Sequence, residues 1–166
     1  LTQLEIKTNV TLHALKLAKE GKAITILNPA PAIKIDKEFF KYIDFFTPNE
    51  TEAEFYYGKK IKNYDDAKEA GNFFVKKGIK NSIITLGDKG IYFTNSKENF
   101  YLPALDLKSK VVDTTGAGDA FSGALASGLE KKMKIKDCLN FAIKVSGIST
   151  KKKGAADAMP FIQDIK

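Results

Sequence analysis

The spacing of apolar residues along the chain changes repeatedly between two patterns. Short apolar runs rich in β-branched residues, such as those at 23–27 and 82–86, predict buried strands. Longer stretches with apolar residues at every third or fourth position predict amphipathic helices, and glycine and proline mark the loops between them. We predict strands at 23–27, 43–46, 82–86, 91–94 and 99–102, and helices at 9–20, 36–42, 47–57, 64–77, 135–150 and 159–165.

Strands that alternate with helices predict an α/β fold, with a mainly parallel sheet and helices on both faces in three layers. We expect the 166 residues to form a single domain, which would bury roughly 70% of the surface exposed by the unfolded chain. Ligands of such sheets bind at the carboxyl ends of the strands. Candidate ligand-binding residues follow the predicted strands at these ends: Asn28, Asn49, Glu52, Thr85, Gly87, Asp113 and Asp119.

The segment 111–121 is the most distinctive in the chain and reads Val-Val-Asp-Thr-Thr-Gly-Ala-Gly-Asp-Ala-Phe. A short apolar run ends here, small residues follow, and a helical pattern continues from Phe121. The amides that open a helix lack partners within the helix, so this turn is suited to bind an anion such as phosphate. A carboxylate beside such a site is well placed to accept a proton from an attacking hydroxyl. The alternative is an ordinary glycine-rich turn in which Asp113 or Asp119 only caps the helix.

The longer motif Asp-Thr-Thr-Gly-Ala-Gly-Asp, followed by Phe121, Gly123 and Ala124, closely resembles the second signature of the ribokinase family of carbohydrate kinases. Four other segments resemble that family in the same order along the chain. The resemblance covers essentially the whole chain but only about the C-terminal half of the family's length, without its N-terminal sugar-binding segment and small lid. These segments are Asn-Pro-Ala-Pro-Ala at 28–32, Thr-Pro-Asn-Glu-Thr-Glu-Ala-Glu at 47–54, Thr-Leu-Gly-Asp-Lys-Gly at 85–90 and Lys-Gly-Ala at 153–155.

The resemblance implies an ATP-dependent sugar kinase that phosphorylates the primary hydroxyl of ribose. By this resemblance Asp119 is the general base and Asp113 binds sugar hydroxyls. The amides of Gly116, Ala117 and Gly118 stabilise the charge on the transferred phosphoryl group. Mg²⁺ bridges the β- and γ-phosphates. The alternatives are another sugar or nucleoside kinase of the same family, or a nucleotide-binding fragment without catalysis.

The same resemblance assigns nucleotide-binding residues. Asn49 and Glu52 act near the phosphates, with Glu52 an indirect ligand of Mg²⁺. Thr85, Gly87 and Gly90 contact the nucleotide, and Ile143 stands where a polar neighbour of adenine is often found. From the residues alone, Thr47 with Glu50 fits a helix capping box, and the glycines fit a hairpin turn.

The family also commonly holds K⁺, largely through backbone carbonyl groups. The resemblance places this monovalent cation near the glycine-rich turn and the segment after the helix at 135–150. The residues that it assigns are Asp113, Thr115, Thr150, Lys153 and Ala155.

Composition narrows the other possibilities. The chain carries a net charge of +7, and all 27 of its basic residues are lysines, scattered among predicted polar faces. We therefore expect no nucleic-acid partner, and any phosphate must be bound by lysine, backbone or metal. The single cysteine, Cys138, and the single histidine, His13, exclude a disulfide framework and make histidine-based nucleophilic catalysis improbable.

The start of the chain resembles neither a secretory signal nor a membrane span. We expect a cytoplasmic protein without a membrane partner, acting on a small-molecule sugar and nucleotide. Exposed sheet edge and apolar surface would also permit a homo-oligomer.

Overall fold

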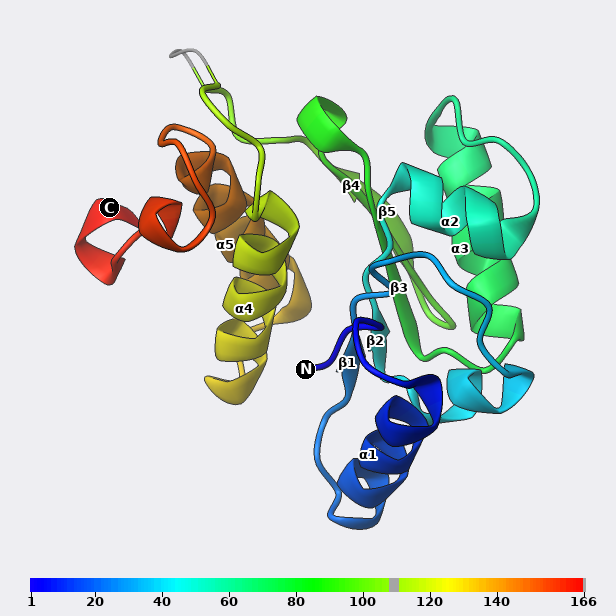
Figure 1. Ribbon diagram of the computed structural model, residues 1–166. Helices are drawn as coiled ribbons and strands as arrows, with labels where there is room; N and C mark the ends of the chain where they lie inside the picture. The colour runs from blue at the N-terminus through cyan, green and yellow to red at the C-terminus, as the bar shows by residue number, and fades with distance from the viewer. Residues whose placement is uncertain (108–110, 166) are drawn as a thin grey trace. The chain divides into compact units, whose positions relative to one another are not determined.

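The chain divides into two compact units, Leu1–Leu102 and Pro103–Lys166. A computed structural model describes residues 1–107 and 111–165 (Figure 1). Within this described part, the first unit contains a five-stranded sheet and the second is helical.

The sheet of the first unit has the strand order β1-β2-β3-β4-β5. The first three strands are parallel, and Phe45 of β2 is paired with Ile26 of β1 and Asn81 of β3. The last three form an antiparallel meander, in which Thr85 is paired with Ile91. The strands are β1 (Ile26–Leu27), β2 (Phe45–Phe46), β3 (Asn81–Thr85), β4 (Ile91–Asn95) and β5 (Asn99–Leu102).

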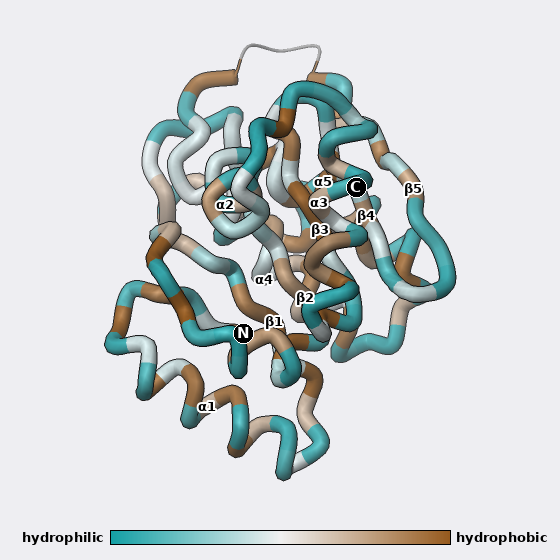
Figure 2. The backbone as a smooth tube through the Cα atoms, turned by 90° about the vertical axis from the view of Figure 1, so that its right-hand side faces the viewer, coloured by the Kyte–Doolittle hydropathy of each residue, from teal (hydrophilic) through white to brown (hydrophobic). Residues whose placement is uncertain are grey.

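The first unit buries its apolar side chains between this sheet and its helices. Phe46 of β2 meets Phe74 of α3 edge to face, with ring centroids 5.1 Å apart. In Figure 2 the α1 helix alternates between hydrophilic and hydrophobic residues, and its Leu15 is buried in the same core. The helical segments are α1 (Thr8–Glu20), η1 (Lys37–Tyr42), α2 (Glu50–Tyr57), α3 (Tyr64–Lys76) and η2 (Gly87–Lys89).

A glycine allows α3 to approach the sheet closely. A Cβ atom on Gly71 would clash with the Thr94 side chain of β4. Both Gly71 and Thr94 are buried, so the methyl group of an alanine would push the helix away from the sheet.

The second unit consists of α4 (Ala117–Glu130) and α5 (Ile135–Ser149), followed by the short 3₁₀ segments η3 (Ala156–Ala158) and η4 (Ile162–Ile165). The two α-helices pack on each other through Leu125, Leu139 and Ala142, which are all buried. Cys138 lies in this interface, and its thiol donates to the carbonyl of Leu125 at 3.5 Å. This cysteine is buried.

Several predicted boundaries are wrong. The strands predicted at 23–27 and 43–46 have only two residues each, because Thr25 and Asp44 bond to each other through their side chains before the ladder begins. The helix predicted at 36–42 is a 3₁₀ helix that begins at Lys37. The helix predicted at 159–165 is reduced to η4, since Pro160 lacks an amide and disfavours helical geometry at the residue before it.

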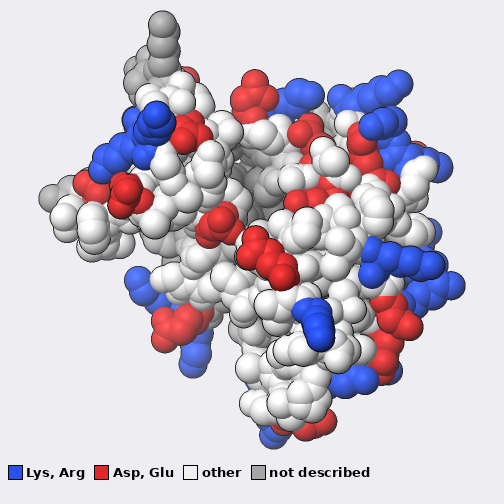
Figure 3. All heavy atoms as spheres, viewed as in Figure 1, with Lys and Arg blue, Asp and Glu red and all other residues white. Residues whose placement is uncertain are grey.

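Charged residues of both signs are interspersed on the face shown in Figure 3, where lysines stand beside carboxylates in several places. Neutralisation by neighbouring carboxylates suits a solvated surface better than a phosphate-binding stripe on this face. None of the helices in the described residues is long and apolar enough to cross a membrane.

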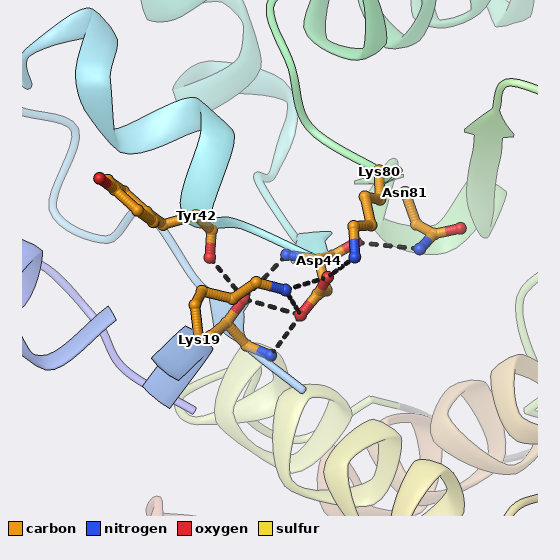
Figure 4. A network of polar contacts seen from close by, with 6 residues as sticks. Lys19, Tyr42, Asp44, Lys80 and Asn81 are labelled. Carbon is orange, nitrogen blue, oxygen red and sulfur yellow. Dashed lines mark hydrogen bonds and ion pairs between the residues drawn. The ribbon is translucent and has the colours of Figure 1, made fainter. Parts of the chain in front are cut away.

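A buried carboxylate ties together the amino ends of the three parallel strands (Figure 4). Asp44, 6% exposed, accepts hydrogen bonds from Lys19 at 2.8 Å and from the amide of Thr25 at 2.9 Å. Lys80 forms an ion pair with it at 2.7 Å. Burial raises the pKa of the Asp44 carboxyl, but the bonds from Lys19 and Lys80 outweigh it and lower the pKa from 3.8 to about 2.

This lowered pKa predicts a sensitivity to acid. Because the folded state binds the proton less tightly, Asp44 contributes stability that is complete above its unfolded pKa of 3.8 and lost as the pH falls toward about 2. The contribution is about 2 kcal/mol, from 1.36 kcal/mol per pKa unit. Urea unfolding between pH 7 and pH 2.5 measures it.

Asp44→Asn should unfold more easily at pH 7 and lose part of the decline in stability at low pH. Asp88→Asn, at an exposed position of the same unit, is the control and should keep that decline. An Asp44→Asn variant with the unchanged pH dependence would show that another carboxylate is responsible.

Candidate functional site

In the first unit, the candidate residues lie where the parallel strands end and α2 begins. Asn49 is the N-cap of α2, and its side-chain oxygen accepts from the Glu52 amide at 2.8 Å. The Glu52 carboxylate accepts in turn from the amide of Asn49 at 2.9 Å and from its side-chain nitrogen at 3.0 Å. Asn49 also forms a bridge with Thr85, so α2 and β3 hold the three candidates together.

The predicted capping box of Thr47 and Glu50 is therefore wrong. The chain at Thr47 still belongs to the sheet edge, where its amide donates to the carbonyl of Leu27 at 3.0 Å. The N-cap lies two residues later, at Asn49, which forms the capping box with Glu52. These two side chains thus have a structural role of their own, in addition to the role that we assign to them below.

Glu52 is a buried carboxylate at a strand end. Its residue is 8% exposed, and burial raises the pKa of its carboxyl although the hydrogen bonds from Asn49 oppose this. The lone pairs that Asn49 leaves can accept further hydrogen bonds. A carboxylate held in this way can orient a water molecule in the shell of a metal ion.

The loop between β3 and β4 contains the other candidates of this unit. Gly87 and Gly90 have positive φ angles of 57° and 103°, and the amide of Leu86 donates to the carbonyl of Gly90 at 2.8 Å. The two glycines meet a backbone requirement of this turn, as the hairpin interpretation predicts. A contact with nucleotide remains a separate prediction.

In the second unit, the glycine-rich segment forms the N-terminus of α4. Gly116 has a φ of 76°, and a Cβ atom there would lie 3.1 Å from the side-chain carbons of both Ala155 and Met159. Only glycine satisfies both constraints. A Cβ atom on Gly118 would meet no atom within 4 Å. Asp119 is exposed in the first turn of the helix, and no side chain caps α4 in the described part of the chain.

This helix start has the properties of an anion site. The first amides of a helix carry the positive end of its dipole, and the helix has 14 residues behind it. The open space at Gly118 lets a ligand approach the backbone. A carboxylate at Asp119 stands beside this position, where it can accept a proton from a bound hydroxyl.

Asp113 connects this segment to the chain that follows α5. One of its oxygens accepts from the amide and hydroxyl of Thr115 at 2.9 and 2.7 Å. The other accepts from the Gly154 amide at 2.9 Å. These hydrogen bonds lower the pKa of the Asp113 carboxyl to about 2, and the bond from the Thr115 hydroxyl has the largest effect.

Backbone hydrogen bonds connect the same two segments, because the amides of Val112 and Asp113 both donate to the carbonyl of Thr150. The residues assigned to a monovalent cation are thus gathered in the second unit: Asp113, Thr115, Thr150, Lys153 and Ala155. Among the described residues, no group of three or more His, Cys, Asp or Glu side chains could hold a metal ion. A cation here would therefore depend on backbone carbonyl groups, and its binding stays a prediction.

The helix α5 adds a residue that the sequence did not indicate. Ile143 is buried on α5, and one turn later the hydroxyl of Ser146 donates to the carbonyl of Ala117 at 2.9 Å. Its partner is a backbone atom 29 residues away. Nothing in the spacing of side chains could have revealed this contact.

The sheet and the glycine-led helix belong to an α/β protein with a ribokinase-like fold, which confirms the predicted fold class. A family model described as pfkB family carbohydrate kinase matches residues 1–162, and the chain belongs to this family. Staphylococcus aureus ribokinase is 37% identical over 99% of this chain and 54% of its own length. Salmonella typhi deoxyribokinase is 33% identical over 97% of this chain and 52% of its own length.

Among solved structures, Arabidopsis thaliana ribokinase complexed with ribose and ATP matches with a TM-score of 0.93 and 28% identity, over 98% of this chain and 53% of that one. The chain thus spans about half the length of the relatives that it matches.

Proposed function

We propose that this chain is the nucleotide-binding and catalytic part of a kinase that transfers the γ-phosphoryl group of ATP to the primary hydroxyl of ribose. The observation that carries the proposal is the open N-terminus of α4 with the Asp119 carboxylate in its first turn. Membership of the carbohydrate kinase family supports it, as do the ribose and ATP in the Arabidopsis structure.

In this proposal Asp119 accepts the proton of the sugar hydroxyl as that oxygen attacks the γ-phosphorus. The amides of Gly116, Ala117 and Gly118 would stabilise the charge on the transferred group, and the Ala117 amide would exchange the Thr114 carbonyl, to which it donates at 3.1 Å, for the phosphoryl oxygen. Asp113 binds sugar hydroxyls through the lone pairs that Thr115 and Gly154 leave. We also propose that the two units belong to a single domain, as the length of the chain predicts.

The nucleotide would be bound by Asn49, Glu52, Thr85, Gly87 and Gly90 of the first unit and by Ile143 of the second. Mg²⁺ would neutralise the phosphate charge. The buried Glu52 carboxylate fits an indirect role through water, because Asn49 already engages both of its oxygens. The carbonyl groups near Thr150 and Ala155 would hold K⁺. We further propose that the enzyme is cytoplasmic and acts on small molecules.

A screen of acceptors tests the substrate. The protein that carries this chain, given ATP and Mg²⁺, should release ADP fastest with ribose. Deoxyribose is the main rival, because a deoxyribokinase is among the similar proteins. A preference for deoxyribose, another sugar or a nucleoside would replace ribose within the same family. Nucleotide binding without turnover on any acceptor would favour a non-catalytic module.

Glu52→Gln tests the magnesium role. Glutamine also suits this position of a capping box, so the variant removes the charge and keeps the start of α2. We expect the Mg²⁺ concentration for half-maximal activity to rise about 10-fold, the lower part of the range for losing an outer-shell partner of a metal. The KM for sugar should change much less.

Glu50→Gln, in the same first turn of α2, is the matched control and should leave the Mg²⁺ requirement unchanged. If Glu52→Gln changed the KM for sugar and left the Mg²⁺ requirement as it was, Glu52 would belong to the sugar site or to the fold alone.

A further inference from the structure

We propose that Ser146 is a positioning residue, which orients the Gly118 amide at the anion-binding end of α4. Its hydroxyl, on α5, donates to the carbonyl of Ala117, the first residue of α4, at 2.9 Å. The catalytic meaning of this contact rests on the proposed function. The contact itself belongs to the second unit alone.

The planarity of the peptide bond gives the contact its effect. The carbonyl of Ala117 and the amide of Gly118 belong to one rigid plane and point in opposite directions. A hydroxyl that fixes the carbonyl oxygen therefore also fixes the direction of the Gly118 N–H. The Ala117 carbonyl also accepts the helical hydrogen bond from four residues later in α4, so the Ser146 hydroxyl adds a second restraint to this plane. Gly118 has no side chain whose packing could add a third.

The other hydroxyls of α5 show how unusual this bond is. Serine and threonine within helices commonly bond to a carbonyl three or four residues earlier. Ser149 does so with Ser146 at 2.7 Å, and Thr150 does so with Gly147 at 2.8 Å. Ser146 instead reaches another helix.

The helix α5 holds the glycine-rich segment at both ends. The carbonyl of Thr150 accepts from the amides of Val112 and Asp113 before the turn, and Ser146 contacts Ala117 after it. Ile143, assigned to the nucleotide, lies one turn before Ser146 on the same helix. Ser146 thus connects α5, which carries the proposed nucleotide residue Ile143, to the first residue of α4.

Two variants and a control test the proposal. Ser146→Ala removes the hydroxyl, Ser146→Thr keeps it, and Ser149→Ala removes a hydroxyl that bonds only within α5. The first readout is the ¹⁵N order parameter of the Gly118 amide, measured by NMR on the 166-residue chain without ligand. The second is steady-state kinetics of the protein that carries the chain, with Mg²⁺, ATP and the best acceptor.

We expect Ser146→Ala to lower the order parameter of the Gly118 amide and to lower kcat about 3- to 10-fold, the effect of one hydrogen bond. The KM for ATP should stay within about 2-fold, because in the proposed function the Gly118 amide contacts the transferred phosphoryl group and not the adenine. Ser146→Thr should retain both values, and Ser149→Ala should leave both unchanged.

An unchanged order parameter at Gly118 in Ser146→Ala overturns the proposal, and so does an equal change in Ser149→Ala. If the unaltered protein phosphorylates no acceptor, the proposed function fails, but the order parameter still decides whether Ser146 orients the amide.

Discussion

Asp119→Asn should lower kcat by about 10²- to 10⁴-fold, the range for losing a general base. Asparagine has nearly the same shape as aspartate but cannot accept the proton of the sugar hydroxyl. The affinity for ATP should change little, because the amides of α4 and the nucleotide residues of the first unit remain. Steady-state kinetics with saturating sugar, together with ATP titration, measure the two quantities.

Asp137→Asn is the matched control for this experiment. Asp137 and Asp119 are both exposed, and both occupy the third position of an α-helix. Each variant therefore loses a similar favourable interaction with a helix dipole, about 0.3–1 kcal/mol. Only Asp119→Asn should lose turnover. Near-normal turnover in Asp119→Asn would remove Asp119 from the catalytic role.

The 166-residue chain by itself should bind ADP weakly and phosphorylate ribose at a negligible rate. It spans about half the length of its relatives, and the resemblance assigns sugar contacts and a lid to their other half. Correct positioning of reactants supplies roughly 7–11 kcal/mol in catalysis. Loss of half the sugar contacts should therefore abolish turnover, while the nucleotide residues remain.

Calorimetry with ADP and a coupled kinase assay, both on this polypeptide, measure the two outcomes. The same polypeptide with Asp119→Asn gives the background, and its residual rate should equal that of the unaltered chain. A rate within the usual enzyme range of about 1–10³ s⁻¹ would contradict the prediction. The sugar site would then lie entirely within these residues.

The helices and strands whose bounds are predicted well have boundary residues that determine the local backbone conformation. Strand β5 has its predicted bounds, and α3 ends one residue before the predicted end. The glycine-rich segment was expected to open a helix, and α4 begins at Ala117. In each case glycine, asparagine or a short apolar run near the boundary determines the backbone.

The predictions that are wrong fall where contacts between residues far apart in the sequence determine the backbone conformation. Thr47 and Glu50 have the right spacing for a capping box, but pairing of Thr47 with Leu27 keeps that residue in the sheet. Thr25 and Asp44 make their strands begin later than predicted, because they bond to each other across 19 residues of sequence. Ser146 was missed for the same reason, since its partner is a backbone carbonyl on another helix.

The capping box of Asn49 and Glu52 has a consequence for reading related sequences. A family member that has lost its activity would still need this pair, or an equivalent one, to begin the helix. Its presence therefore cannot separate active kinases from inactive descendants. If Asp119 is the general base that we propose, it is the better marker, because it is exposed and does not belong to this capping box. A survey for pseudoenzymes should sort sequences by that carboxylate first.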